Sequence, residues 1–198
     1  MNLRVWSIFL CITIPALLSG CIEEEVPATE SIPYYVGFEA ETLGRDVDLK
    51  STINFNRDID GPKLVLWVAS GCSGCHDWTH LLSEQKENNS DFEDVNIVFI
   101  HRYGSLEGTS SVMDRYGSNE SDTYAPWPIL LPNQDTVVFD EMTKEQSSFS
   151  IYEAFSQPVT PTLQVIDSDG VLLWQSKSYW SNETVLQDAM NMYNKVRA

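Results

Sequence analysis

Basic residues are scarce in this sequence, which has 12 Lys and Arg against 29 Asp and Glu and a formal net charge of −17. A nucleic-acid backbone or an anionic lipid surface would repel a chain with this balance. We therefore expect no nucleic-acid partner. The acidic run Glu23–Glu25 is more typical of a solvated segment than of a metal site.

Long hydrophobic runs are also lacking. The apolar stretch at residues 5–18 follows Arg4 and is shorter than the roughly 20 residues that a membrane-spanning helix needs. It is typical of the core of a signal peptide. It ends in Leu18-Ser19-Gly20-Cys21, which resembles the lipobox of prokaryotic lipoproteins.

That resemblance implies that residues 1–20 are a lipoprotein signal peptide and that Cys21 becomes the lipidated first residue of the mature chain. Two acyl chains would hold the protein firmly on the extracytoplasmic face of the cell membrane. An ordinary secretory signal with a coincidental cysteine, or an uncleaved anchor helix, are the alternatives.

Cysteine is rare as well, with four in the chain. Cys11 lies in the signal-peptide stretch and Cys21 is the expected lipidation site, so Cys72 and Cys75 are the two that remain. An exported chain with one remaining pair has no disulfide framework of the kind that stabilises small secreted domains. The remaining pair must therefore serve another purpose.

The composition fits one domain after an extended leader. Residues 21–36 are acidic, interrupted by proline, and show neither helical nor strand periodicity, so we expect a flexible tether. Residues 37–198 form the expected globular domain, because 42% of the chain is hydrophobic and there is no internal repeat.

A strand–helix–strand unit is predicted around the two cysteines. Residues 64–69 are continuously apolar, as in a strand that is buried on both faces. Helical spacing of apolar residues follows from Cys75 until Asn88, and residues 95–100 indicate a second buried strand. These features predict a βαβ unit with a right-handed crossover.

The rest of the chain predicts shorter elements. We expect a strand at residues 127–131, a short helix at 149–155, and a hairpin whose strands, 163–166 and 171–174, flank a turn-rich sequence. A terminal helix follows Ser181 or Asn182 as N-cap. Its apolar stripe is expected to comprise Val185, Ala189, Met192, Tyr193 and Val196.

Cys72-Ser73-Gly74-Cys75 lies where the buried strand passes into a helix. A helix N-terminus offers partial positive charge and free amide donors, which stabilise a thiolate at Cys72 and lower its pKa. Cys75, one turn later on the same face, can resolve a mixed disulfide. These residues predict thiol–disulfide exchange that needs no cofactor beyond the redox-active disulfide itself.

These motifs resemble the thioredoxin superfamily, and within it the TlpA/ResA-like extracytoplasmic oxidoreductases. Residues 46–49 are similar to the strand that precedes the family's active-site strand, residues 61–72 to the active-site strand itself, and residues 159–167 to the segment that carries a cis-proline. The resemblance implies an α/β fold with a central mixed sheet flanked by helices, and an inserted helix and strand between the CxxC helix and the cis-proline segment.

The same resemblance implies roles for individual residues. Pro161 should be cis and lie beside the cysteines, and the Thr160 backbone should offer hydrogen bonds to a docked polypeptide. The family's role is usually reductive, on exported cysteine-containing proteins such as apocytochromes, with electrons from a membrane thiol carrier. Gly71 replaces the family's usual Trp, Ser73-Gly74 replaces Gly-Pro or Glu-Pro, and Leu66 occupies the position of thioredoxin's buried acid.

His76 leaves alternatives open. We expect it to be an exposed residue of the first helical turn that, when protonated, favours the Cys72 thiolate. The CxxC-His pattern also fits covalent haem attachment, but no extended haem-binding pattern accompanies it. With His80, the two cysteines and His76 could instead hold zinc or copper(I) in a metal-delivery module.

Two further readings remain. A peroxiredoxin would share the fold, but residues 69–72 do not reproduce its Thr-x-x-Cys setting. A surface lipoprotein could also retain the dithiol for stability alone.

Overall fold

The computed structural model describes residues 31–104 and 106–197 of the chain. The expected signal peptide and the lipidation site Cys21 lie outside these residues. The elements, in chain order, are β1 (Val36–Gly37), β2 (Glu39–Thr42), η1 (Asp46–Asp48), β3 (Thr52–Asn54), β4 (Lys63–Val68), α1 (Ser73–Asn88), η2 (Ser90–Phe92), β5 (Ile97–His101), α2 (Thr109–Val112), η3 (Met113–Gly117), β6 (Ile129–Leu131), β7 (Val137–Asp140), β8 (Gln146–Ser150), α3 (Ile151–Ala154), β9 (Thr162–Ile166), β10 (Leu172–Ser176) and α4 (Glu183–Arg197).

Within the described residues the strands form two sheets. The larger has the order β10-β9-β4-β5-β6-β2-β3, and the smaller has the order β1-β7-β8. β4, β5 and β6 run parallel, whereas β9 pairs antiparallel with β4 and β2 pairs antiparallel with β6. The predicted α/β fold with a central mixed sheet is thereby confirmed.

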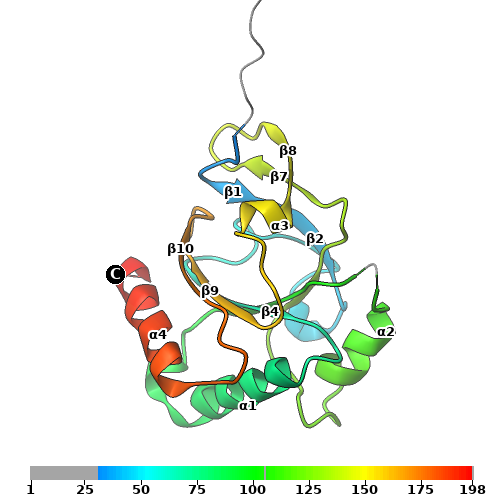
Figure 1. The fold of residues 1–198 in the computed structure, drawn as a ribbon, viewed down its shortest axis with the longest axis vertical. Helices are drawn as coiled ribbons and strands as arrows, with labels where there is room; N and C mark the ends of the chain where they lie inside the picture. Colours follow the sequence, from blue (N-terminus) through cyan, green and yellow to red (C-terminus); the bar gives the residue numbers. More distant parts are fainter. Residues whose placement is uncertain (1–30, 105, 198) are drawn as a thin grey trace, which may run out of the picture.

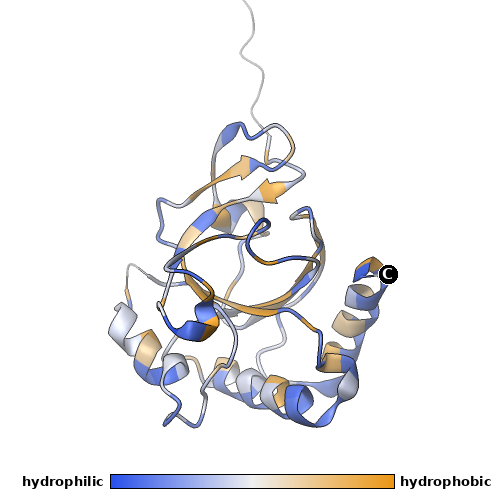
Figure 2. Ribbon diagram, turned by 180° about the vertical axis from the view of Figure 1, so that it is seen from behind, coloured by the Kyte–Doolittle hydropathy of each residue, from blue (hydrophilic) through white to orange (hydrophobic). Residues whose placement is uncertain are grey.

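Strand β4 is apolar throughout because it has a core on each face. Successive side chains of a strand point to opposite faces. Leu64, Leu66 and Val68 pack with α1 and α4, while Val65 and Trp67 pack with the aromatic cluster beside the smaller sheet. Figure 1 shows α1 and α4 on one side of the large sheet and the small sheet with α3 on the other. Figure 2 shows the hydrophobic central strands between these layers.

Several predicted elements occur at their expected places. The buried strands at 64–69 and 95–100 are β4 and β5, the helix that ends at Asn88 is α1, and the hairpin is β9–β10. In α4, the Asn182 side chain accepts from the Val185 amide at 3.1 Å, as an N-cap does.

The apolar stripe of α4 is shifted by about one position from the prediction. Its buried residues are Leu186, Ala189, Met190 and Tyr193, whereas Val185 and Met192 are half-buried and Val196 is exposed. The helix therefore turns Leu186 and Met190 toward the sheet.

Residues 46–49 do not form the expected strand. Asp46–Asp48 is a 3₁₀ turn, because the Asp48 carboxylate turns back to accept from the Arg45 amide at 2.9 Å and from its guanidinium at 2.7 Å. Asp48 is completely buried and also accepts from the Ile129 amide at 3.0 Å. The charge pair thus joins this turn to β6.

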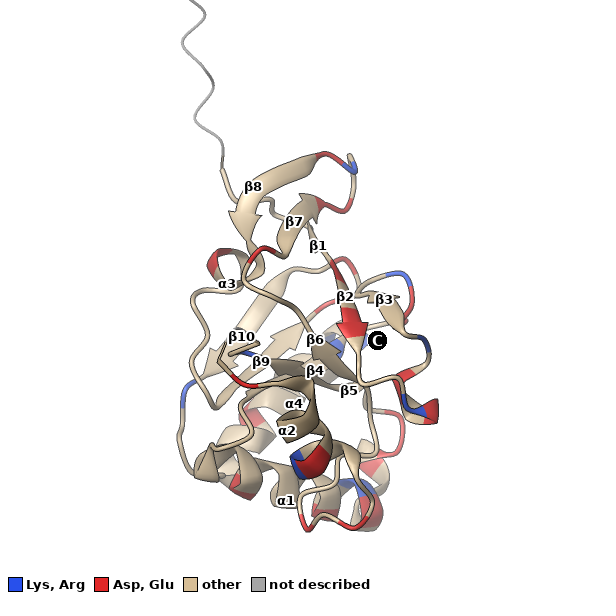
Figure 3. Ribbon diagram, turned by 90° about the vertical axis from the view of Figure 1, so that its right-hand side faces the viewer, with Lys and Arg blue, Asp and Glu red and all other residues tan. Residues whose placement is uncertain are grey.

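The inserted region contains more than one helix and one strand. It includes a helix that passes from α2 into a π-helical turn, the parallel strand β6, and the β7–β8 hairpin with α3. β7 pairs with both β1 and β8 in the small sheet, and Ile151 of α3 is completely buried. Acidic residues lie on the outer helices and on the tip of this hairpin (Figure 3).

Candidate active site

The two cysteines lie at the junction between β4 and α1, as predicted. Cys72 is the N-cap of α1, and its sulfur accepts from the Cys75 amide at 3.1 Å. The two residues form a disulfide with a Cα–Cα distance of 5.2 Å. The cap position exists because β4 ends at Val68 and the chain turns over residues 69–72 before the helix begins.

The two sulfurs differ in their surroundings. Cys72 retains 8% exposure, whereas Cys75 is completely buried. The Cys75 sulfur lies 3.9 Å from the Trp67 carbonyl oxygen at the end of β4. An incoming thiolate would therefore reach Cys72 before Cys75, and a reduced Cys75 thiol has a carbonyl acceptor within reach.

Pro161 follows a cis peptide bond, as the resemblance implied. Thr162, the next residue, pairs with Trp67 in the β4–β9 register. Because the Trp67 carbonyl also approaches Cys75, the Thr160–Pro161 segment lies at the same end of the sheet as the disulfide. The Val159 amide donates to the Thr162 hydroxyl at 3.1 Å and closes this turn.

His76 is half-buried, so the prediction of an exposed first-turn histidine is wrong. Its Nε2 lies 2.9 Å from the Ser70 carbonyl oxygen, and since a carbonyl can only accept, this nitrogen carries the proton. The ring also packs edge-on against Tyr116, with centroids 5.9 Å apart. His76 therefore supports the loop before Cys72.

Metal binding gains no support from this arrangement. The His76 ring is directed to the Ser70 carbonyl, and His80 is exposed one turn further along α1. Over residues 31–104 and 106–197, no group of three His, Cys, Asp or Glu side chains is placed to hold a metal ion.

Three side chains that the sequence analysis missed hold the same loop. The Tyr116 hydroxyl donates to the Ala69 carbonyl at 2.8 Å. Glu107 accepts from the Ser70 amide at 2.7 Å and from the Gly71 amide at 3.4 Å, and His101 Nε2 lies 2.9 Å from the same carboxylate. These residues come from β5 and the insertion, more than 30 positions away, so no local motif could have indicated them.

The surroundings shift the pKa values of two of these groups, Tyr116 and Glu107. Burial raises the pKa of the Tyr116 hydroxyl well above its ordinary value, so the phenol remains a donor. Burial also tends to raise the pKa of Glu107, but hydrogen bonds from the Ser70 amide and from His101 outweigh it, and the net pKa is lowered. Glu107 is therefore ionised at neutral pH.

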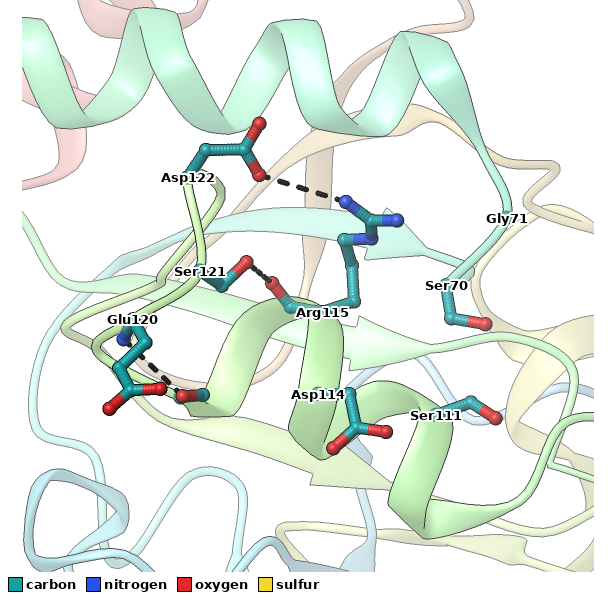
Figure 4. A pocket seen from close by; sticks show the side chains of 9 residues that line it. Ser70, Gly71, Ser111, Asp114, Arg115, Glu120, Ser121 and Asp122 are labelled. Carbon is teal, nitrogen blue, oxygen red and sulfur yellow. Dashed lines mark hydrogen bonds and ion pairs between the residues drawn. The ribbon is translucent and has the colours of Figure 1, made fainter.

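An open cavity of about 800 Å³ lies beside Ser70 and Gly71. Its other walls are polar residues of α2, η3 and the loop that follows, including Ser111, Asp114 and Arg115 (Figure 4). Arg115 points toward Asp122, 3.7 Å away. The cavity gives one side of the active-site loop direct access to solvent.

On the other side of α1, residues 178–181 are hydrogen-bonded to side chains of the first helical turns. The Trp78 indole donates to the Ser178 carbonyl at 3.0 Å, and the Ser181 amide donates to the Asp77 carboxylate at 2.8 Å. Between them, Tyr179 and Trp180 remain 47% and 60% exposed. Large exposed apolar side chains beside a reactive group are typical of a protein-docking surface.

Neither protein-family models nor curated proteins match the sequence. Solved structures do match. The thioredoxin domain of a thiol-disulfide oxidoreductase from Bacteroides vulgatus has a TM-score of 0.52 and 15% identity, over 85% of this chain and 98% of that one. MTB dsbF, solved in mixed oxidized and reduced forms, has a TM-score of 0.54 and 13% identity, over 82% and 99%.

The pneumococcal exposed lipoprotein thioredoxin from Streptococcus pneumoniae has a TM-score of 0.51 and 17% identity, over 78% of this chain and 98% of that one. The fold is that of thioredoxin. In this thioredoxin fold the CxxC pair and the cis-proline occupy one end of the sheet, while β1, β7, β8 and α3 form an additional layer on the face opposite α1.

Proposed function

We propose that the protein is a thiol-disulfide oxidoreductase that acts on exported cysteine-containing proteins through Cys72 and Cys75, as a reductant. The observation that carries the proposal is the disulfide between a Cys72 that caps α1 and a completely buried Cys75. An accessible sulfur paired with a protected one suits an attacking and a resolving cysteine.

The exchange requires two displacement steps. The Cys72 thiolate attacks one sulfur of a substrate disulfide, forms a mixed disulfide and releases the other substrate sulfur as a thiolate. Cys75, after losing its proton, then attacks the Cys72 sulfur, so that the second substrate thiolate leaves and the Cys72–Cys75 disulfide forms. Two electrons from a membrane thiol carrier would restore the dithiol.

The N-terminus of α1 supports the first step. The Cys75 amide already donates to the Cys72 sulfur at 3.1 Å, and the 16-residue helix adds its dipole. Both favour a thiolate at Cys72 over a thiol.

Substrate docking is proposed to involve the segment before β9. A polypeptide in extended conformation could pair with the Thr160 backbone next to Pro161, and His76 would support the active-site loop from behind. Val159, beside this segment, and Tyr179 and Trp180, in the segment across the start of α1, are exposed and would contact apolar side chains next to the substrate cysteine.

The test is the pair of single-cysteine variants. Cys72→Ser is expected to lose all exchange with a disulfide substrate such as insulin, because no accessible sulfur remains. Cys75→Ser is expected to accumulate a mixed disulfide with substrate that cannot resolve, visible on a non-reducing gel. If Cys72→Ser lowered the melting temperature but left exchange activity intact, the pair would serve stability alone.

We further propose a membrane anchor, with a signal peptide at 1–20, lipid on Cys21, a tether at 21–36 and the domain at 37–198. Val36, at the end of the proposed tether, already pairs with Asp140 in the small sheet. No helix in the described parts of the chain is long and apolar enough to cross a membrane. The matching Streptococcus pneumoniae structure is that of an exposed lipoprotein thioredoxin, which supports the proposed anchor by analogy. Cys21→Ser is expected to move the protein from the membrane to the soluble fraction, and Cys11→Ser, the matched control, should stay with the membrane.

A further inference from the structure

The carboxylate of Glu107 binds the backbone amides of the two residues that precede Cys72. Its two oxygens accept from the Ser70 amide at 2.7 Å and the Gly71 amide at 3.4 Å, and His101 Nε2 lies 2.9 Å away. His101 is 2% exposed at the end of β5, so the carboxylate is supported from inside the protein. Three hydrogen-bond donors hold this negative charge against the active-site loop.

Strand β4 supplies no charged side chain near the cysteine pair at the position that thioredoxin fills with a buried acid. Leu66, six positions before Cys72, is completely buried and apolar. Of the other titratable groups on α1 near the pair, Asp77 accepts from the Ser181 amide on the opposite side of the helix, and His76 faces the Ser70 carbonyl. Glu107 is thus a carboxylate brought to the loop by a different element, the connection between β5 and α2.

We infer that Glu107 is a positioning residue that sets the redox balance of the Cys72–Cys75 pair and makes it a stronger reductant. A fixed negative charge disfavours the Cys72 thiolate of the reduced form and leaves the neutral disulfide unaffected. The inference rests on the proposed exchange activity and concerns the direction of electron flow.

The reaction to measure is the equilibrium with glutathione. Two glutathione thiols supply two electrons to the protein disulfide, giving the protein dithiol and one glutathione disulfide. In the purified full chain, Glu107→Gln keeps the shape of the side chain and removes its charge. At a pH above the Cys72 pKa, we expect the equilibrium to shift about tenfold toward the reduced protein, which is about 30 mV.

Matched variants separate charge from packing. Glu107→Asp keeps the charge and should remain within about twofold of wild type. Glu84→Gln removes an exposed charge further along α1 and should change nothing. The Cys72 pKa, followed by thiolate absorbance, should fall in Glu107→Gln alone.

A second pair of variants tests the same effect if Glu107→Gln does not fold. Gly71 is exposed, and a Cβ there would lie 3.9 Å from Glu107, an ordinary contact. Gly71→Lys should shift the equilibrium toward the reduced protein relative to Gly71→Met.

The outcomes distinguish the two proposals. A wild-type protein whose disulfide never exchanges with glutathione would overturn the proposed function. A wild-type protein that exchanges, with Glu107→Gln indistinguishable from Glu84→Gln or Gly71→Lys indistinguishable from Gly71→Met, would overturn the role of Glu107.

Discussion

Gly74 lies in the first turn of α1, where a methyl group has no room. A Cβ at this position would overlap the carbonyl oxygen of Tyr179, in the segment fastened across the start of the helix. The family that the sequence resembles usually has proline here, but the close approach of the Tyr179 backbone explains the preference for glycine in this chain.

Gly74→Ala is therefore expected to destabilise the protein by about 1–3 kcal/mol, as overpacking does. In an open helical position the same change would stabilise by about 1 kcal/mol, so the sign of the effect tests the contact. Urea unfolding of the oxidised protein measures it, and Ser73→Ala, at an exposed position of the same turn, is the control. A stabilised Gly74→Ala protein would mean that residues 178–181 do not pack against the helix.

The residues of the site differ in how far sequence could reveal them. Cys72, Cys75 and Pro161 carry local motifs, and each lies where its motif predicts. Glu107 and Tyr116 carry none, because their partners are the backbone amides and carbonyls of residues 69–71, which any sequence possesses. A contact between a side chain and a distant backbone leaves no pattern in the chain.

At the scale of elements, Arg102 connects the inserted layer to the cis-proline segment. Its guanidinium lies 3.7 Å from the ring centroid of Tyr152 in α3 and donates to the Pro158 carbonyl at 3.0 Å. Its own amide donates to Val68 at the end of β4. The side chain therefore joins α3 to the segment before Pro161, and the backbone of the same residue joins both to β4.

Arg102→Ala should lower the free energy of unfolding by about 2 kcal/mol, because a charged hydrogen bond and a cation–π contact are lost together. It should also raise KM for a polypeptide disulfide, because the altered segment is the one proposed to contact the substrate. The reduction potential should stay unchanged, because the surroundings of the two sulfurs are not altered. Steady-state kinetics and glutathione equilibration separate these effects. Arg57→Ala, at an exposed arginine, is the control, and an equal KM in both variants would contradict the role.

The elements that could be predicted share one property: a pattern within their own residues, such as an apolar run or a helix cap, is enough to indicate the strand or helix. β4 is apolar because both faces are buried, and α1 begins at its cap. The turn at 46–48 could not be predicted, because Arg45 and Asp48 are buried there only through contacts with residues 116–129. The small sheet depends likewise on pairing between β1 and β7, about 100 residues apart.

At the scale of the whole molecule, this acidic protein buries a lysine, Lys63, that has no hydrogen-bond partner among the described residues. Lys63 is the first residue of β4 and is completely buried. It lies 5.1 Å from the centroid of the Phe55 ring. Burial lowers the Lys63 pKa from its ordinary 10.5 to about 8, although the charges of Asp167 and Asp60 oppose the shift.

This shift predicts how stability varies with pH. Between about pH 8 and 10.5 the unfolded chain keeps the Lys63 proton while the folded protein has lost it. Because the unfolded state then binds more protons, stability rises with pH across this window, by up to about 3 kcal/mol. Below pH 8 both states are protonated and the folded state carries the full penalty of a buried charge.

Urea unfolding of the oxidised protein at pH 7 and pH 9 measures this slope. At pH 9 the tyrosines of the unfolded chain, whose ordinary pKa is 10, are still mostly protonated, so the raised pKa values of the buried tyrosines oppose the slope only weakly. Lys63→Met should be more stable than wild type at pH 7, because a neutral side chain of similar length fills the same space. It should lose most of the slope and keep only the smaller contribution of Lys86, whose pKa burial also lowers. Lys195→Met, on the exposed face of α4, should keep the wild-type slope. If the free energies of unfolding of wild type and Lys63→Met changed in parallel with pH, the prediction would be contradicted. That result would mean that the Lys63 ammonium is hydrated in the folded protein, because a hydrated ammonium keeps its ordinary pKa.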